Sequence, residues 1–236
     1  MTALDKEQTL ERILQSYRSV IVAYSGGVDS AYLAWLAQKA LGNRAWAVTA
    51  DSPSYPEHHR QLAIRIASEF GLQHEIIATS ELEREEYRAN PTNRCYYCKQ
   101  ELYTRLTELA RSRGAVVVDG SNADDRGDYR PGRQAAREFG VRSPHDEVGL
   151  AKDDIRELSR RAGLPTWDEP ASSCLSSRIP YFSEVTDEKL RTIERAEQAV
   201  RRLGFRIVRV RHHDSLARVE IGREEITHAT ELTARP

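Results

Sequence analysis

The sequence predicts an α/β fold, namely a doubly wound parallel sheet followed by a small α+β unit. Four short apolar runs in the first 120 residues alternate with segments of helical periodicity, the pattern of parallel strands joined by right-handed crossover helices. The first run is continuously apolar, as expected of a strand buried on both faces. With 236 residues, the chain is long enough for one such domain and a smaller appendage.

The expected elements follow one another in a regular order. The strands are residues 20–23, 45–48, 75–78 and 115–118. The helices are residues 10–17, 31–41, 56–70 and 99–113, where apolar side chains recur at helical spacing. Gly42, Gly71 and Gly114 stop the last three helices, as glycine commonly does. Residues 120–149 are rich in Gly, Asp and Arg and are expected to form a functional loop.

A second, smaller unit is predicted after residue 170. A short helix at 152–162 closes the first domain, and residues 163–183, with three prolines and a serine cluster, form the connection. The second unit is expected to contain a helix at 187–203 and strands at 205–211 and 217–221. Thr186 is the expected N-cap of that helix. The predicted domains are therefore residues 1–170 and 171–236.

Composition excludes several classes of protein. The charges of the 35 basic and 36 acidic residues nearly cancel, so the chain as a whole is not expected to bind nucleic acid electrostatically. A local basic patch is still compatible with this composition. No stretch approaches the roughly 20 apolar residues of a membrane span. Residues 1–11 lack the apolar core of a signal peptide, so we expect a cytoplasmic protein. Three cysteines without such a signal favour metal-binding or catalytic thiols over disulfides.

A loop rich in serine and glycine separates the first strand from its helix. The glycines allow a sharp turn that brings N–H groups, serine hydroxyls and the positive end of the helix around an anion. The candidate phosphate ligands are Ser25, Gly26, Gly27, Asp29 and Ser30. The loop lacks both Gly-Lys-Ser/Thr and Gly-x-Gly-x-x-Gly, which argues against a P-loop NTPase and a dinucleotide fold. A strand-to-helix turn without function is the alternative.

In this context the loop resembles the pyrophosphate loop of the ATP pyrophosphatase (PP-loop) superfamily. The resemblance implies that ATP binds here with Mg²⁺, activates a carboxyl or carbonyl group as an adenylate, and releases pyrophosphate. Thr49, Asp51 and Ser52 follow the second strand, where these proteins hold the adenosine. For that segment a simple helix-entry turn is the alternative.

The three cysteines fall in two segments. Cys95 and Cys98 form a C-x-x-C just before the predicted helix at 99, and Cys174 lies in the connection between the domains. A zinc site usually needs four ligands, and the sequence has no second C-x-x-C. Three thiolates with one open position suit an iron–sulfur cluster with one iron free for chemistry. Three buried, reduced cysteines that pack as small hydrophobic residues are the alternative.

The second unit is rich in arginine. Arg209 and Arg211 alternate along a predicted strand and therefore share a face suited to a phosphate, unless that face is merely solvated. Glu197 lies on an amphipathic helix, where a glutamate is usually solvated. The histidine pairs 58–59 and 212–213 are interpreted as surface residues.

Taken together, these features resemble the LarE family, PP-loop sulfur-insertion enzymes of nickel-pincer nucleotide synthesis, from the Ser25 loop to about Ile221. The specific marks are the segments at 119–122, 128–132, 176–181 and 209–211. The resemblance implies ATP-dependent thiolation of pyridinium-3,5-biscarboxylic acid mononucleotide, with AMP displaced by sulfur. One version of the family sacrifices a cysteine sulfur. The other holds a four-iron four-sulfur cluster on three cysteines, and this sequence has all three.

The family also implies roles for single residues. Cys95, Cys98 and Cys174 would ligate the cluster, and Gly120 would contact the nucleotide. Arg209, Arg211 and Arg178 would bind the substrate phosphate or free carboxylate, while Glu197 would orient the substrate or transfer a proton. The expected partners are a small nucleotide substrate, a sulfide donor and further copies of the chain, since the family forms hexamers. Relatives continue with further strands, so we expect a missing tail or a smaller second domain.

Three other functions remain open at this stage. A tRNA thiolase of the same superfamily would need a broad basic surface. An amide-forming PP-loop synthetase, such as an NAD or GMP synthetase, would make the cysteines incidental. A nucleotide or iron–sulfur sensor without catalysis is the third.

Overall fold

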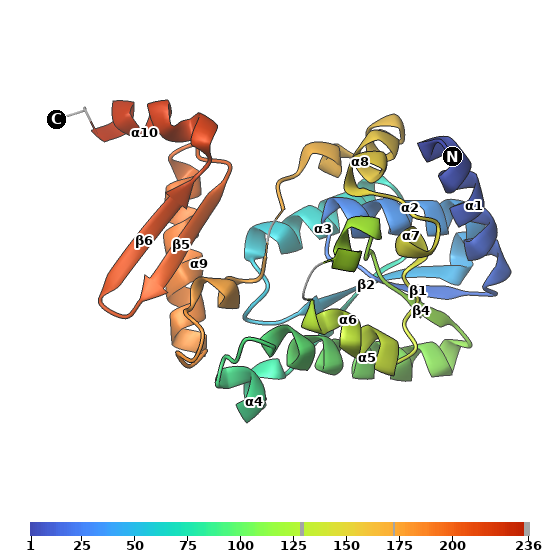
Figure 1. Ribbon diagram of the computed structural model, residues 1–236, viewed down its shortest axis with the longest axis horizontal. Coiled ribbons are helices and arrows are strands. Elements are labelled where there is room, and N and C mark those ends of the chain that lie inside the picture. The colour runs from blue at the N-terminus through green and yellow to red at the C-terminus, as the bar shows by residue number, and fades with distance from the viewer. Residues whose placement is uncertain (128–129, 172, 234–236) are drawn as a thin grey trace.

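The computed structural model describes residues 1–127, 130–171 and 173–233. A four-stranded parallel sheet in the order β3-β2-β1-β4 forms the main domain (Figure 1). Its strands are β1 (Val20–Ala23), β2 (Ala45–Asp51), β3 (His74–Ala78) and β4 (Val116–Val118). The α/β parallel-sheet prediction is confirmed, and all four predicted strands are present within a few residues of their expected bounds.

Helices cover both faces of this sheet (Figure 1). One face carries α1 (Ala3–Ser16), α2 (Val28–Leu41), α3 (Glu57–Glu69) and α8 (Lys152–Arg161). The other face carries α5 (Arg94–Arg113) and α6 (Pro131–Glu138). Side chains that alternate along β1 enter the two cores in turn: Val20 and Val22 enter the first, and Ile21 the second.

The prediction that residues 120–149 form a loop is wrong for part of that segment. It contains α6 and the short helix α7 (Pro144–Glu147). Pro131 occupies the first turn of α6, and Ala135 and Ala136 pack against α5. Two buried alanines among arginines give too weak an apolar signal for a helix to be predicted from the sequence.

Helix α5 begins five residues before its predicted start. Cys95 and Cys98 therefore lie in its first two turns rather than ahead of it. The early turns have little apolar periodicity because Arg94, Tyr97 and Cys98 face the segment after Cys174 instead of the sheet.

The C-terminal unit consists of α9 (Asp187–Arg202), an antiparallel hairpin of β5 (Val208–His213) and β6 (Leu216–Ile221), and α10 (Ile226–Thr233). Strand β5 begins three residues later than predicted. The backbone N–H groups of Arg206 and Ile207 donate to the Glu225 carboxylate and not to a strand. A small core around Phe205, Val208 and Val210 joins the hairpin to α9.

A third core joins segments that lie far apart in the sequence. Tyr87, just ahead of α5 in the short helix α4 (Glu85–Arg88), packs with Leu175, Ile179 and Leu190. The region before the C-x-x-C is thus packed against the connection that carries Cys174. Within the described part of the chain, no helix combines the length and apolar character needed to cross a membrane.

Candidate active site

The predicted phosphate loop, residues 25–30, curls tightly over the start of α2. Its Gly26 has a φ of +69°, and a Cβ there would lie 2.8 Å from the Cβ of Ala63 on α3, so only glycine fits without strain. Within the loop, Ser30 Oγ accepts from the Ser25 N–H (3.1 Å) and donates to the Gly27 carbonyl (3.2 Å). These contacts hold Ser25, Gly27 and Ser30 together at the N-terminus of α2.

A second loop, which follows β4, lies directly on the first. A Cβ at Gly120 would be 3.0 Å from the backbone nitrogen of Ser30, so this glycine permits the close approach. Asn122 Nδ2 donates to Asp29 Oδ1 at 3.3 Å, and Lys152 forms an ion pair with the other Asp29 oxygen. Asp29 and Lys152 thus place a carboxylate and an ammonium beside the phosphate loop.

Sequence reasoning missed Lys152 as a site residue, although a signal was available. Lys152 is the first residue of α8, where the helix dipole disfavours a cation. A lysine in that position needs another reason to be there, and its pairing with Asp29 supplies one.

The phosphate loop and Cys174 line the same cavity, of about 470 Å³. Its walls include Ser25, Gly27, Asp29, His59, Asn122, Lys152 and Cys174. The structure therefore brings three of the five predicted phosphate ligands, Ser25, Gly27 and Asp29, and one predicted thiol to a common space.

The predicted adenosine contacts lie at the carboxyl end of β2. Thr49 is buried, donates to the Tyr24 carbonyl (2.8 Å) and lies 2.8 Å from His74 Nε2, so its hydroxyl is already occupied. Asp51 forms an ion pair with Arg60 at 3.2 Å. Asp51 and Ser52 line a cavity of about 810 Å³, which lies between this end of β2 and α9.

The cysteines are grouped around Arg94, a buried residue that sequence reasoning also missed. Cys98 and Cys174 line one small cavity of about 150 Å³, whereas Cys95 is exposed. Burial opposes the charge of Arg94, but the nearby acidic groups of Cys174, Tyr87, Cys95 and Cys98, when ionised, outweigh it and raise the Arg94 pKa. Burial raises the pKa of the Cys98 thiol, and the buried carboxylate of Glu81 adds to the effect.

These thiols can be tested for their fit to an iron–sulfur cluster. Three thiols within electrostatic reach of one guanidinium are the donor type that such clusters use. As the described side chains stand, no three Cys, His, Asp or Glu residues lie close enough to hold a single metal ion. The three thiols are of the right donor type and lie in one region around Arg94, so they fit an iron–sulfur cluster. The positions that they would take as ligands remain a prediction.

Buried polar side chains hold the two thiol segments together. Arg94 Nη1 donates to the Ser176 carbonyl at 2.8 Å, and Tyr87 Oη lies 2.6 Å from Ser176 Oγ. Asn90 Nδ2 donates to the carbonyls of Pro180 (2.7 Å) and Ser183 (3.0 Å). The segment before the C-x-x-C is thereby fastened to the one after Cys174.

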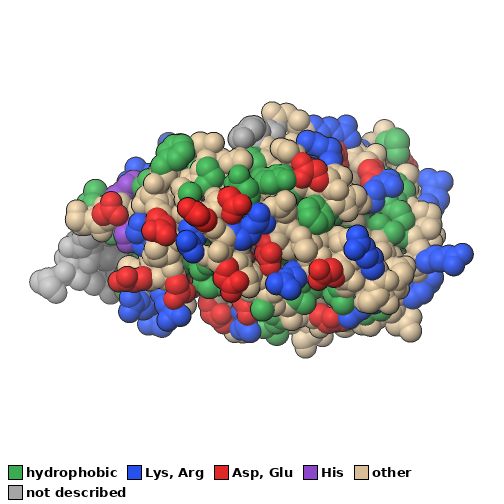
Figure 2. Space-filling model, turned by 90° about the horizontal axis from the view of Figure 1, so that it is seen from below, with side chains coloured by type: hydrophobic (Ala, Val, Ile, Leu, Met, Phe, Trp, Pro, Cys, Tyr) green, Lys and Arg blue, Asp and Glu red, His purple; other side chains and the backbone are tan. Residues whose placement is uncertain are grey.

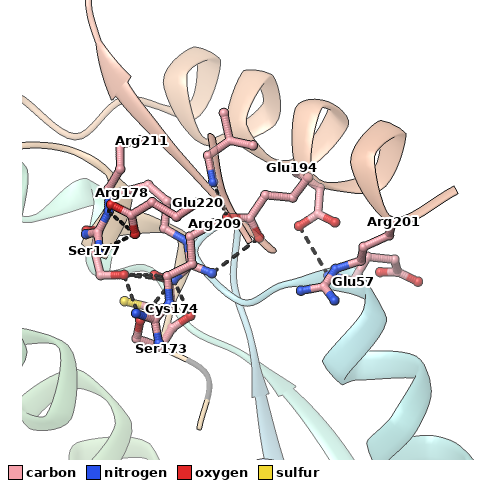
Figure 3. Close-up of polar contacts among 12 residues, drawn as sticks. Glu57, Ser173, Cys174, Ser177, Arg178, Glu194, Arg201, Arg209, Arg211 and Glu220 are labelled. Atoms are coloured by element: carbon pink, nitrogen blue, oxygen red, sulfur yellow. Dashed lines mark hydrogen bonds and ion pairs between the residues drawn. The ribbon is translucent and has the colours of Figure 1, made fainter. Parts of the chain in front are cut away.

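Arg178 and Glu197 form a buried ion pair, with a shortest N–O distance of 2.7 Å and side-chain exposures of 1% and 2%. Arg178 Nη1 also donates to the carbonyls of Ser173 (2.9 Å) and Cys174 (3.2 Å), as Figure 3 shows. Glu197 accepts from the Val210 N–H at 3.0 Å, so it is buried rather than solvated. The Arg178 guanidinium and the Glu197 carboxylate are thus hydrogen-bonded to other groups of the protein. The pair connects the Cys174 loop to the hairpin.

Comparisons with known proteins identify the family of the chain. Residues 5–125 match the family model of NAD synthase. The chain is 36% identical over 222 residues to pyridinium-3,5-bisthiocarboxylic acid mononucleotide synthase of Lactiplantibacillus plantarum, a match covering 93% of this chain and 80% of that protein. The chain belongs to the NAD synthase-like PP-loop ATP pyrophosphatases.

Two further relatives extend the comparison. An uncharacterized protein of Synechocystis is 47% identical over 224 residues, covering 93% of this chain and 84% of that protein. The fold is similar to that of the NH₃-dependent NAD synthetase from Campylobacter jejuni, with a TM-score of 0.58 and 16% identity, over 86% of this chain and 88% of that one. At this identity the second comparison supports the fold alone.

In this PP-loop protein, Arg209 and Arg211 lie on one face of β5, as predicted from their alternation. Arg209 donates to the Ala171 carbonyl at 3.3 Å, and Arg211 donates to the Ser177 carbonyl at 2.9 Å. Arg211 also forms an ion pair with Glu220 at 3.0 Å. Both arginines reach the Cys174 loop, and their role as substrate ligands stays a prediction.

The interpretation of His58 and His59 as surface residues is wrong for His59, and His58 is half-buried. His59 is buried and lines the cavity of about 470 Å³ that the predicted phosphate loop shares with Cys174. Burial and nearby positive charge, including Arg201, lower the pKa of His58 to about 3 and that of His59 to about 4. His145 is buried beside Asp29 and Asp119, and burial lowers its pKa to about 4. These histidines are neutral near pH 7.

Proposed function

We propose that this PP-loop enzyme inserts sulfur into pyridinium-3,5-biscarboxylic acid mononucleotide, converting a carboxylate into a thiocarboxylate at the expense of ATP. The observation that carries the proposal is the cavity of about 470 Å³ that the phosphate loop shares with Cys174. The printed name of the Lactiplantibacillus relative, a pyridinium-3,5-bisthiocarboxylic acid mononucleotide synthase, supports this substrate.

The first half-reaction is adenylation. A carboxylate oxygen of the substrate attacks the α-phosphorus of ATP, and pyrophosphate leaves. Preorganised donors near the developing charge stabilise such a step, and the phosphate loop with Lys152 supplies them. Mg²⁺ would lie between the phosphates and a carboxylate of the cavity, for which Asp29 and Asp124 are the candidates.

The second half-reaction is attack of sulfur on the carbonyl carbon, with AMP leaving. Cys174 lies in the same cavity, so sulfur at this position meets the adenylate without a large movement. Cys95, Cys98 and Cys174 would hold a four-iron four-sulfur cluster, which supplies a transferable sulfide when bound. In the sacrificial variant, the sulfur of Cys174 itself is transferred. Arg178 and Glu197 keep the Cys174 loop in place in either case.

An amide-forming synthetase is the second candidate, because the matching family model is that of NAD synthase. It would use the same adenylate with ammonia in place of sulfur. A tRNA substrate is less well supported. Acidic and basic side chains are interspersed over the face in Figure 2. The cavity of about 810 Å³ is lined by more acidic than basic side chains: Asp51, Glu57, Asp187, Glu188 and Glu194 against Arg191 and Arg195.

The test is product analysis with the anaerobically prepared enzyme, ATP, Mg²⁺, sulfide and the pyridinium substrate. We expect thiocarboxylate, AMP and pyrophosphate in equal amounts. Amide formed with ammonia, and no thiocarboxylate with sulfide, would contradict the proposal. Many turnovers with an unchanged protein mass support sulfide carried by the cluster. One turnover with dehydroalanine at Cys174 supports the sacrificial route.

A further inference from the structure

A buried histidine lines the cavity of about 470 Å³ that the predicted phosphate loop shares with Cys174. His59 is 7% exposed, and its Nε2 atom has no hydrogen-bond partner in the described part of the chain. A buried polar nitrogen without a partner costs free energy, and native proteins retain few such groups. This nitrogen therefore indicates a ligand that enters the cavity and accepts a hydrogen bond there.

The other side-chain donors of this cavity already contact groups of the protein. Each forms a hydrogen bond or an ion pair: Ser25, Tyr55, Asn122, Arg130, Lys152 and Ser173. Among the described side chains of the cavity wall, His59 is the donor that can bind a ligand without breaking an existing contact.

The surroundings of His59 favour an anion. His59 is the third residue of α3, and the N-cap of this helix, Pro56, lines the same cavity. The N-terminus of a helix carries a partial positive charge. Burial, together with the positive charge of Arg201 and Arg178, lowers the pKa of His59 to about 4. The imidazole is therefore neutral near pH 7 and keeps one N–H, which it can donate to an anion without giving up the proton.

The proposed reaction places an anion between the phosphate loop and Cys174. Pyrophosphate leaves at the loop, and sulfur attacks the carbonyl carbon at Cys174. The α-phosphorus is bonded to pyrophosphate in ATP and to the acyl group in the adenylate, so it lies between these two points. His59 lines the same cavity as Ser25 and Gly27 of the loop and as Cys174.

We propose that His59 donates a hydrogen bond to a non-bridging oxygen of the α-phosphate, first in ATP and then in the adenylate. This role rests on the adenylation chemistry of the proposed function. In adenylation the substrate carboxylate forms a P–O bond, and the bond to pyrophosphate breaks. In sulfur transfer a C–S bond forms, the C–O bond breaks, and AMP leaves with the electron pair. A preorganised N–H stabilises the charge on the α-phosphate in both steps, and the proton stays on the imidazole.

The first test is substrate-dependent exchange of labelled pyrophosphate into ATP. His59→Phe removes the donor and should lower kcat for exchange by about 10²–10³, with little change in the KM for ATP. His59→Gln keeps an N–H donor and should retain most of the activity. His58→Phe is the matched control on the same turn of α3, because His58 is not among the described side chains that line this cavity.

A second readout separates contact with the α-phosphate from a structural role. In adenosine 5′-O-(1-thiotriphosphate), sulfur replaces one of the two non-bridging α-oxygens, and each diastereomer places this weaker hydrogen-bond acceptor at a different oxygen. With Mg²⁺ throughout, the wild-type chain should use one diastereomer more slowly than the other. His59→Phe should lose much of this difference, whereas His58→Phe should keep it.

Two results would overturn this role of His59: wild-type exchange by His59→Phe, or an unchanged ratio of the two diastereomers in that variant. If circular dichroism shows that His59→Phe has lost its fold, His59→Ala replaces it in both measurements.

Failure of the wild-type chain to exchange pyrophosphate with the pyridinium substrate would contradict the proposed function instead. Calorimetry with AMP and with pyrophosphate needs no acyl substrate and then decides the contact. Weaker binding of AMP by His59→Phe, with unchanged binding of pyrophosphate, supports a contact with the α-phosphate. Equal binding of AMP by the variant and the wild type would overturn it.

Discussion

The phosphate loop is built from six consecutive residues, whereas the thiol site is assembled from two segments that are far apart in the chain. Ser25 and Ser30 contact each other within one turn. Arg94 and Ser176 are separated by 82 residues and nevertheless share a buried hydrogen bond. The first site depends on local backbone geometry, and the second depends on tertiary packing. Substitutions should therefore affect the two sites differently.

The largest expected effect concerns the packing that holds the thiol loop. Arg178→Met leaves Glu197 buried without its partner, which typically costs about 3–5 kcal/mol of unfolding free energy. Chemical denaturation measures this loss. The control is Arg191→Met on α9, the helix that also carries Glu197. It breaks an exposed pair with Asp187 and should cost about 0.5 kcal/mol or less of unfolding free energy. Equal losses in the two variants would show that the buried pair has no special role.

The next-largest effect is expected on the rate of adenylation rather than on the stability of the fold. Asp29→Ala removes the partner of Lys152 at the phosphate loop, and loss of one preorganised group typically lowers the rate by about 10²–10³. Pyrophosphate release measures the rate, and thermal melting should change little. Asp153→Ala, which removes an exposed carboxylate next to Lys152, is the control. Normal release from Asp29→Ala would exclude this residue from adenylation.

A comparison of two glycine substitutions separates backbone strain from steric crowding in the loop. Gly26→Ala imposes a positive φ on alanine and forces its Cβ against Ala63, with an expected cost of about 1–3 kcal/mol beyond the conformational term. Gly71→Ala has a similar φ of +62° and nothing within 4 Å. The difference in unfolding free energy between the variants measures the contact between the loop and α3. A difference near zero would mean that α3 shifts to make room for the added Cβ without a measurable cost.

The last effect is a dependence of stability on pH. The pKa of His59 and of His145 is lowered to about 4, against about 6.5 in an unfolded chain. As pH falls from about 6.5 to 4, the unfolded state takes up protons that the folded state does not. Stability is therefore complete above pH 6.5 and falls by up to about 1.4 kcal/mol per pH unit for each histidine. His59→Gln should flatten this slope in denaturation at pH 7 and pH 5, and an unchanged slope would mean that His59 titrates freely.

The same contrast decides what the sequence could predict. The sheet and the phosphate loop were predictable because apolar runs and a six-residue motif carry their signals locally. The start of α5 and the role of Arg94 were not, since each depends on the packing of residues 82–98 against residues 175–193. The buried state of Glu197 was not predictable either, because it depends on the ion pair with Arg178. A glutamate on an amphipathic helix looks the same in sequence whether or not an arginine is buried beside it.

The central claim is that one cavity joins a phosphate loop that activates a carboxylate to a thiol that delivers sulfur. The direct measurement is substrate-dependent exchange of labelled pyrophosphate into ATP by Cys174→Ala, alongside thiocarboxylate formation by the same variant. The account predicts that exchange continues while no thiocarboxylate forms. Thiocarboxylate made by Cys174→Ala at the wild-type rate would contradict it.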